Sequence, residues 1–407
     1  MSINKFYDVV IIGGGMVGLC LANQIIERKA GRNICIIDKE NKLGLHSSGR
    51  NSGVLHAGIY YKPKTIKAQV CISGSLRLKE WIKERKLPIN NCGKLIVPQS
   101  ENLDSQLDEL ILRGRANGAK VELITEKEIY KFCPDANSTT GRAIWSENTS
   151  VVNPKIILYE LERELIQKGV TILKGGKALK FYPDKKSISL KSSEISYGHL
   201  INCAGLEAAQ IAHKFNVGRN FYIIPFKGIY WQIKKSSSIK ISTNVYPVPD
   251  LNMPFLGVHF TPDANPNNEV SIGPTATFAF GRENYKGFKG IEVLRSIRNI
   301  KTISQLYYSN NGGFRGYIHN QSLQNIPLIM IKEAKKIIPK ITLNQIEPSK
   351  KVGIRSQLYN STKNRFEDDF ICKNGFHSTH LMNAISPAFT SSFSLADLII
   401  DNSELNS

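Results

Sequence analysis

The sequence has no run of eighteen apolar residues, so it contains no candidate for a helix that spans a bilayer. An apolar strand is predicted to begin at Tyr7, so a cleavable signal or transit peptide is not expected. Internal repeats and long low-complexity segments are also missing from the 407 residues. These absences favour a cytoplasmic globular protein, built as two domains or as one large elaborated domain.

Cysteine is scarce, and the few cysteines are not spaced like the members of a disulfide framework or the ligands of a metal site. The chain has seven cysteines, an odd number, and no C-x-x-C pair. A disulfide framework and a structural zinc site are therefore not expected, and we predict no metal site. Scattered single thiols of this kind are typical of a reducing cytoplasm.

Acidic residues are few: 34 against 54 basic residues, which gives a net charge of +20. Such an excess can attract nucleic acid, an anionic membrane or anionic small molecules. The lysines are spread along the chain and no zinc-finger, RRM, KH or helix-turn-helix pattern occurs, so no nucleic-acid partner is expected. Residues 329–341 form a basic, partly amphipathic stretch. It could make a peripheral membrane contact on the inner face of a membrane, but packing of a helix on the core is the preferred interpretation.

Glycine is concentrated at one informative place near the N-terminus. An apolar strand over residues 7–12 leads into Gly13-Gly14-Gly15-Met16-Val17-Gly18, and a helical pattern follows at once. In this motif Gly13 permits a tight turn, Gly15 lets the backbone approach phosphates, and Gly18 lets the helix pack against the strand. The helix N-terminus then attracts an anion. The pattern predicts a site for a dinucleotide pyrophosphate.

Three later segments indicate that the dinucleotide is FAD rather than NAD. Residues 33–38 form a second strand whose last residue, Asp38, lies twenty positions after Gly18, where an acid binds the adenosine ribose. Residues 47–54, rich in glycine and hydroxyls, could wrap phosphate and ribitol, and residues 200–205 form a late strand that ends in small residues. The predicted contacts in and beside these segments are Asp38, Lys39, Ser47, Ser48, Asn51, Ser52, Gly53, Val54, Ala204 and Gly205.

The block over residues 52–63 (SGVLHAGIYYKP) resembles the L-2-hydroxyglutarate oxidases and dehydrogenases, in the D-amino-acid-oxidase-like group of FAD enzymes. Further similar blocks follow in the same order at residues 93–97, 202–206, 245–250, 254–262, 273–276, 353–357 and 383–388. The chain departs from the family pattern at Arg50, Thr275, Ile354 and Ile385. The resemblance implies FAD-dependent oxidation of L-2-hydroxyglutarate, or a close L-2-hydroxy acid, with electrons passed to oxygen or a quinone.

Oxidation of a secondary alcohol needs a base, a hydride acceptor and a clamp for the substrate. Flavin would accept the hydride, and either His56 or His259 is the candidate base. Arg355, a charge inside an apolar run, is the candidate clamp for a carboxylate. Further substrate candidates are Lys227 as a second cation and the hydroxyls of Tyr60 and Tyr246, for which packing is an equal explanation.

Residues 383–388 are expected to return the chain to the flavin through Ser386, Pro387 and Ala388. A helix over residues 391–400 could then aim its N-terminal amides at the pyrimidine end of the ring, or could be a plain terminal helix.

The expected fold is α/β, elaborated to α+β, with a Rossmann-like FAD domain of glutathione-reductase type and a substrate domain on an antiparallel sheet. The FAD domain would comprise residues 1–75, 150–224 and 350–407, and the substrate domain residues 76–149 and 225–349. Two other functions remain open: an FAD-dependent amine or amino-acid oxidase, and an RNA-binding flavoprotein suggested by the charge.

Overall fold

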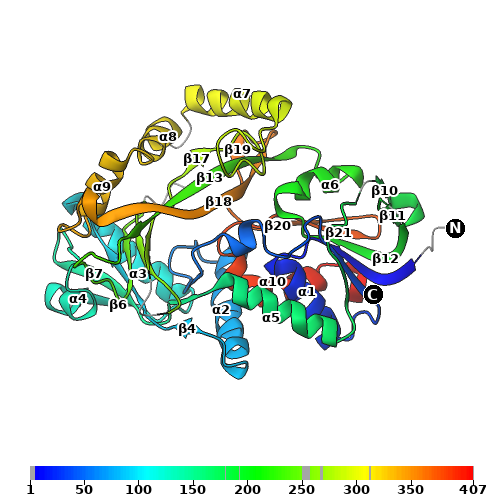
Figure 1. Ribbon diagram of the computed structural model, residues 1–407, viewed down its shortest axis with the longest axis horizontal. Coiled ribbons are helices and arrows are strands. Elements are labelled where there is room, and N and C mark those ends of the chain that lie inside the picture. The colour runs from blue at the N-terminus through cyan, green and yellow to red at the C-terminus, as the bar shows by residue number, and fades with distance from the viewer. Residues whose placement is uncertain are drawn as a thin grey trace.

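The computed structural model describes residues 5–178, 180–191, 193–249, 257–265, 269–310 and 313–406. Asp250 and residues 254–256, which belong to the family-like blocks, lie outside the described residues. The predicted mixed α/β class is confirmed: two large sheets lie side by side, each with its own helices (Figure 1).

The first sheet has eight strands in the order β10-β11-β12-β1-β2-β9, with β21 and β20 continuing from β12. Its centre is parallel, because β1 pairs in parallel with both β2 and β12, whereas β10, β11 and β20 pair antiparallel. The strands are β1 (Lys5–Ile12), β2 (Ile34–Ile37), β9 (Thr171–Leu173), β10 (Lys180–Tyr182), β11 (Ser187–Ser189), β12 (Glu194–Asn202), β20 (Ile371–Gly375) and β21 (Ser378–Asn383).

Helices cover both faces of this sheet. Val9, Val10 and Ile11 in β1 are fully buried, as expected for a central parallel strand covered on both sides. One face carries α1 (Met16–Glu27), α2 (Ile66–Glu84), α5 (Pro154–Gln167) and α10 (Ala388–Asp401), and the other carries α6 (Ala208–Lys214). Helices α2 and α10 pack closely because Gly74 has no side chain: a Cβ there would lie 2.7 Å from the Ser391 backbone.

The second sheet has ten strands, mostly antiparallel, in the order β19-β18-β13-β16-β15-β14-β5-β7-β6, with β17 paired to β13. Its long strands β13 (Phe221–Ile233) and β18 (Ile346–Asn360) carry the chain between the two sheets. The others are β5 (Lys94–Val97), β6 (Glu122–Thr125), β7 (Arg142–Ser146), β14 (Asn244–Pro247), β15 (Phe260–Pro262), β16 (Val270–Ile272), β17 (Thr277–Phe278) and β19 (Arg365–Phe366). A separate small sheet joins β3 (Val54–Leu55), β8 (Ser150–Val152) and β4 (Ile89–Asn90).

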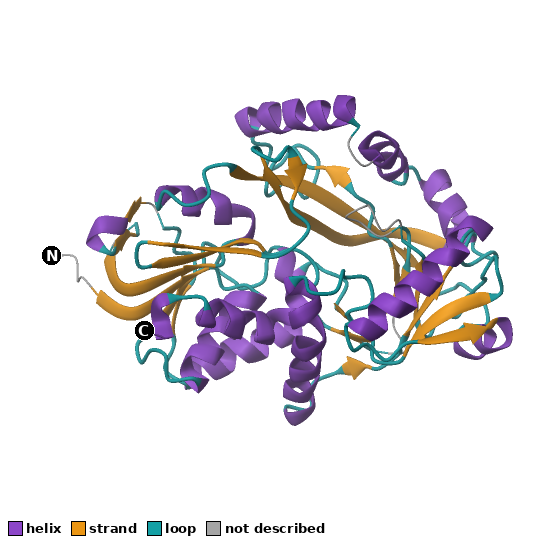
Figure 2. Cartoon of the chain, turned by 180° about the vertical axis from the view of Figure 1, so that it is seen from behind, coloured by secondary structure: helices purple, strands orange, loops and turns teal. Residues whose placement is uncertain are grey.

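Helices α3 (Asp104–Ala116) and α4 (Glu126–Phe132) accompany β6 and β7. Helices α7 (Val293–Ser309), α8 (Phe314–Leu323) and α9 (Pro327–Lys335) lie along the outer side of the second sheet (Figure 2). In the basic stretch 329–341, the side chains of Met330, Ile337, Ile338 and Ile341 are buried in the core. Packing, the preferred interpretation of that stretch, therefore matches the structure.

The strands of the first sheet all fall within residues 1–75, 150–224 and 350–407. Strands β13 and β18 run across two of the predicted boundaries, and β19 belongs to the second sheet, so the exact domain division stays a prediction. Within the described ranges, no helix combines the length and hydrophobicity that a transmembrane segment requires.

Candidate active site

The glycine turn between β1 and α1 has no room for side chains. Gly13 has φ +106°, and a Cβ on it would lie 2.6 Å from the Cys203 carbonyl oxygen. A Cβ on Gly18 would lie 2.0 Å from the carbonyl oxygen of Gly13. Helix α1 begins after Gly15, which offers no capping side chain. The turn therefore presents bare backbone at a helix N-terminus, the geometry that binds a phosphate.

Two cavities meet at this turn. The larger, about 650 Å³, lies between the two sheets, and the smaller, about 180 Å³, lies beside the ends of β1 and β2. Both are lined by Gly15, Ser47, Ser48, Cys203 and Gly205. A dinucleotide that places its pyrophosphate on the turn would extend one end into each cavity, so the shape of the site fits FAD.

Most of the predicted cofactor contacts line one or both cavities. The larger cavity is lined by Gly15, Ser47, Ser48, Asn51, Ser52, Val54, Gly205, Ser386, Pro387 and Ala388. The smaller is lined by Gly13, Gly15, Asp38, Lys39, Ser47, Ser48, Ala204 and Gly205. Gly18 and Gly53 line neither and instead permit close packing, since a Cβ on Gly53 would lie 2.0 Å from the Val152 oxygen.

Asp38 and Ser48 hold the turn in place. The Gly14 N–H donates to Oδ2 of Asp38 at 2.8 Å, and the Met16 N–H donates to Oγ of Ser48 at 3.0 Å. The Asp38 carboxylate also accepts a hydrogen bond from the Glu40 N–H at 2.9 Å. Lys39, predicted with Asp38, has its ammonium paired with Glu283.

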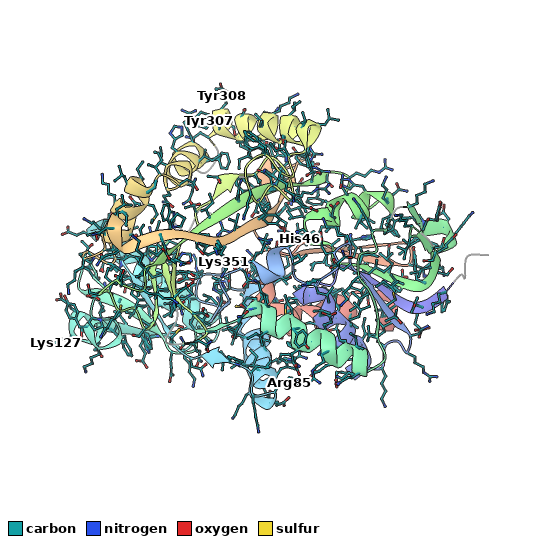
Figure 3. The ribbon with its side chains drawn as sticks, in the orientation of Figure 1. His46, Arg85, Lys127, Tyr307, Tyr308 and Lys351 are labelled. Carbon is teal, nitrogen blue, oxygen red and sulfur yellow. The ribbon has the colours of Figure 1, made fainter. Side chains whose placement is uncertain are left out.

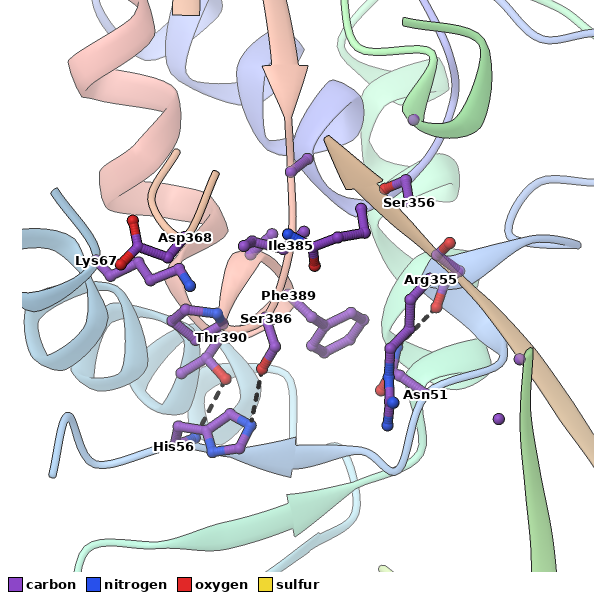
Figure 4. A pocket seen from close by; sticks show the side chains of 18 of the residues that line it. Asn51, His56, Lys67, Arg355, Ser356, Asp368, Ile385, Ser386, Phe389 and Thr390 are labelled. Carbon is purple, nitrogen blue, oxygen red and sulfur yellow. Dashed lines mark hydrogen bonds between the residues drawn. The ribbon is translucent and has the colours of Figure 1, made fainter. Parts of the chain in front are cut away.

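His56 lies directly after β3 and is tied to the C-terminal part of the chain (Figure 4). Its backbone N–H donates to Oγ1 of Thr390 at 3.1 Å, and its Nε2 atom lies 3.4 Å from Oγ of Ser386. Burial, reinforced by the charges of Lys94, His259 and Lys67, holds the pKa of His56 well below 6.5. The ring is therefore neutral at neutral pH and able to accept a proton.

His259, the other candidate base, belongs to an aromatic wall of the same cavity. Its ring stacks on Tyr246, with centroids 4.0 Å apart and an interplanar angle of 22°. Nδ1 lies 2.8 Å from the Gly257 carbonyl oxygen, so Nδ1 donates and Nε2 is left as the acceptor. Burial lowers the pKa of His259 to about 3.

The three other predicted substrate residues have different positions. Arg355 on β18 and Tyr60 after β3 both line the larger cavity, and the Tyr60 hydroxyl has no partner among the described residues. Lys227 on β13 lines neither cavity, and its ammonium lies 3.3 Å from Oδ1 of Asn284. The structure thus gathers the two histidines, Tyr60, Tyr246 and Arg355 at one cavity and leaves Lys227 outside it.

Two lysines near the site were missed by the sequence predictions. Lys94 on β5 is fully buried behind the aromatic wall, 4.1 Å from the ring centroid of Tyr246 and 5.2 Å from that of Tyr60. Lys67, in the first turn of α2, lines the cavity itself. Lys94 begins the otherwise apolar strand 94–97, a signal similar to the one that singled out Arg355. No comparable signal marks Lys67, which lies on an ordinary helix.

The C-terminal loop and helix complete the cavity. Helix α10 begins at Ala388, three residues earlier than expected, after Pro387 and without a capping side chain. Its first turn lines the larger cavity together with Ser386. The N-terminus of a helix favours negative charge, so the start of α10 suits the end of a cofactor on which such charge develops.

Comparisons with known proteins agree with this geometry. Residues 8–402 match the family described as FAD dependent oxidoreductase. The L-2-hydroxyglutarate dehydrogenases of Caenorhabditis briggsae (mitochondrial) and Indibacter alkaliphilus are 33% and 32% identical to this chain. Each alignment covers 97% of this chain, with 92% and 98% of the respective relative.

Among solved structures, the L-alpha-glycerophosphate oxidase of Mycoplasma pneumoniae with FAD bound superposes with a TM-score of 0.73 at 20% identity, covering 97% of this chain and 94% of that one. Glycine oxidase from Geobacillus kaustophilus gives 0.71 at 15% identity, over 98% and 94%. At these identities the structures establish the fold. From the family match over nearly its whole length and from its relatives, the chain belongs to the FAD-dependent oxidoreductases, in the family of the L-2-hydroxyglutarate dehydrogenases.

Proposed function

We propose that this protein oxidises L-2-hydroxyglutarate, or a close L-2-hydroxy acid, to the 2-oxo acid. The observation that carries the proposal is one cavity that joins the glycine turn to a neutral histidine, His56, and a cation, Arg355. A base and an anion clamp beside a flavin site are what the oxidation of a hydroxy acid requires. Relatives named for this reaction support the substrate assignment.

Bound FAD supplies the hydride acceptor for this reaction. His56 is the proposed base, and its Nε2 atom, which faces the cavity-lining Ser386, takes the hydroxyl proton. Arg355 binds the carboxylate next to the reacting carbon through its planar guanidinium. The hydroxyl of Tyr60 is available to donate a hydrogen bond to the same substrate. The stacked rings of Tyr246 and His259 form one wall of this part of the cavity.

Anaerobic reduction of the purified holoenzyme tests the reaction directly. L-2-hydroxyglutarate should bleach the flavin absorbance, and the D-enantiomer should leave it oxidised. Bleaching by amines or amino acids, without bleaching by hydroxy acids, would replace the proposal by an amine or amino-acid oxidase.

We propose that the electron acceptor is a membrane quinone rather than oxygen. We also propose that α7 forms the face by which the protein docks on an anionic bilayer. The side chains of Leu294 and Ile297 are 86% and 62% exposed on this helix, which contains no acidic residue. Arg298 and Lys301 are exposed on the same helix, and Lys289 just precedes it. Figure 3 shows α7 at the outer edge of the molecule. Exposed apolar side chains with cations on or near the same helix fit the surface of an anionic bilayer at the cytoplasmic face of a membrane.

Vesicle co-sedimentation tests this face. Wild-type protein should bind vesicles with phosphatidylglycerol and not vesicles of phosphatidylcholine alone, and Leu294→Gln with Ile297→Gln should abolish binding. Leu112→Gln, at a leucine of α3 that is 68% exposed, is the control. Binding unchanged by the α7 substitutions would reject the docking face. If oxygen reoxidises the reduced enzyme faster than a quinone analogue does, the proposal of a quinone as the acceptor is rejected.

A further inference from the structure

Besides Arg355, five cationic residues that the proposed reaction does not use line the active-site cavity: Arg50, Lys62, Lys67, Arg113 and Arg365. Lys67 lies in the first turn of α2, is half-buried, and lines the cavity with His56 and Arg355. In Figure 4 the Lys67 and Arg355 side chains enter from opposite sides, with Ser386 and Phe389 between them and His56 at one edge. Two cations on opposite sides of one cavity fit a ligand that has an anionic group at each end.

The surroundings of Lys67 leave its ammonium available. The Asp369 carboxylate accepts hydrogen bonds from the backbone N–H groups of Ile66, Lys67 and Phe370, so it is engaged in capping α2. In the described part of the chain, Lys67 forms no ion pair within 4.0 Å. The other groups that face it are Asp368, Cys71 on its own helix and the ring of Tyr61, whose centroid is 5.8 Å from Nζ.

We propose that Lys67 binds the distal carboxylate of the substrate and thereby selects dicarboxylic over monocarboxylic 2-hydroxy acids. Arg355 then binds the carboxylate beside the reacting carbon, which both kinds of substrate have. This inference rests on the proposed function and adds a residue that determines specificity. A charge-assisted hydrogen bond in a water-poor cavity is strong enough to separate two substrates that differ by one carboxylate.

The test compares L-2-hydroxyglutarate with L-2-hydroxyvalerate, which has the same chain length and lacks the distal carboxylate. In Lys67→Met we expect kcat/KM for L-2-hydroxyglutarate to fall about 10- to 100-fold, mainly through KM. For L-2-hydroxyvalerate it should change less than about threefold, because that substrate leaves Lys67 unused. Lys67→Arg should restore part of the preference. Arg355→Met should lower kcat/KM for both substrates.

Lys64→Met is the matched control, because Lys64 is exposed, close in sequence and absent from the cavity lining, and its loss changes the net charge equally. Binding of glutarate, followed by the shift of the flavin spectrum, gives a readout that needs no turnover. Glutarate binding should weaken in Lys67→Met and not in Lys64→Met. Butyrate binding should be equal in the wild-type protein and in both variants.

The outcomes separate this inference from the proposed function. If wild-type enzyme is not reduced by L-2-hydroxyglutarate, the proposed function fails. If wild-type enzyme is reduced but Lys67→Met loses both substrates equally, or neither, only the role of Lys67 is rejected.

A pH profile adds a second check. Burial lowers the pKa of Lys67 to about 8, against the opposing effects of Asp369 and Asp368. Since only the ammonium attracts a carboxylate, kcat/KM for the dicarboxylate should decline above about pH 8 in wild-type enzyme. The decline should be missing for L-2-hydroxyvalerate and in Lys67→Met. An identical decline for both substrates would contradict the assignment.

Discussion

The Nε2 atom of His56 lies 3.4 Å from the Oγ atom of Ser386, although 330 positions separate the two residues in the chain. The contact joins the loop after β3 to the start of α10 and fixes the imidazole at the cavity edge. His56, the proposed base, has no carboxylate partner in the described part of the chain, so only its neutral form could take up a proton from the substrate.

Replacing His56 by Gln should remove the proton acceptor while keeping a polar side chain of similar size. We expect kcat to fall about 10²- to 10⁴-fold, with FAD content unchanged. Stopped-flow measurement of the reductive half-reaction gives the rate, and the flavin-to-protein absorbance ratio gives the loading. His259→Gln is the comparison variant. If His56→Gln keeps the wild-type rate of flavin reduction and His259→Gln loses it, His259 is the base instead.

The acid side of the pH profile follows from the burial of His56. Because the pKa of the free enzyme's histidine lies well below 6.5, its neutral form persists as the pH falls through 6.5. The kcat/KM for L-2-hydroxyglutarate should therefore stay constant from pH 7 to below 6.5, and decline only at lower pH. An acid limb with its midpoint at or above 6.5 would show that the base is a solvated group instead.

Gly18→Ala tests the close packing of the glycine turn. The new Cβ would lie 2.0 Å from the Gly13 carbonyl oxygen, so the turn must shift. We expect a loss of about 1–3 kcal/mol in the free energy of unfolding and weaker FAD binding. Urea unfolding of the apoprotein and flavin fluorescence titration measure the two effects. Gly316→Ala in α8, where no atom lies within 4 Å, should be neutral or slightly stabilising.

Much of this site follows from local patterns. The turn at Gly13 to Gly18 and Asp38 at the end of β2 could be recognised because a βαβ unit places them by short-range geometry alone. Family-like blocks marked His56, His259 and Arg355, and all three line the same cavity.

The positions of Lys227 and Lys67 relative to the cavity could not be predicted from local sequence patterns. Whether a side chain of β13 enters the cavity depends on how that strand pairs with β18, about 130 residues later, and Lys227 lines neither cavity. Lys67 lines the cavity because α2 packs on α10, and Lys94 lies behind Tyr246 because β5 pairs with β14. The sequence around Lys227 and Lys67 carries no signature of these long-range contacts, and the apolar strand that follows Lys94 indicates burial without indicating the contact with Tyr246.

Lys94→Met should stabilise the protein near neutral pH. Burial lowers the pKa of Lys94 from 10.5 to about 7, so the unfolded chain holds the proton more tightly than the folded one. The folding free energy lost by burying the Lys94 ammonium is fully present below about pH 7 and disappears above about pH 10.5. We expect the variant to gain about 1–4 kcal/mol in the free energy of unfolding at pH 7, and clearly less at pH 10. Urea titrations at the two pH values measure the difference, and a variant less stable at pH 7 would contradict the prediction.

The hydrogen bonds of His56 to Ser386 and Thr390 also set the order in which the enzyme can become active. A ribosome makes the glycine turn, the base and both sheets before it makes α10. A chain that still lacks residues 386–401 has neither the anchors of His56 nor the first turn of α10 that lines the cavity, and it leaves the faces of α1 and α2 that pack on α10 uncovered. Completion of the cavity around His56 therefore requires the last helix to dock.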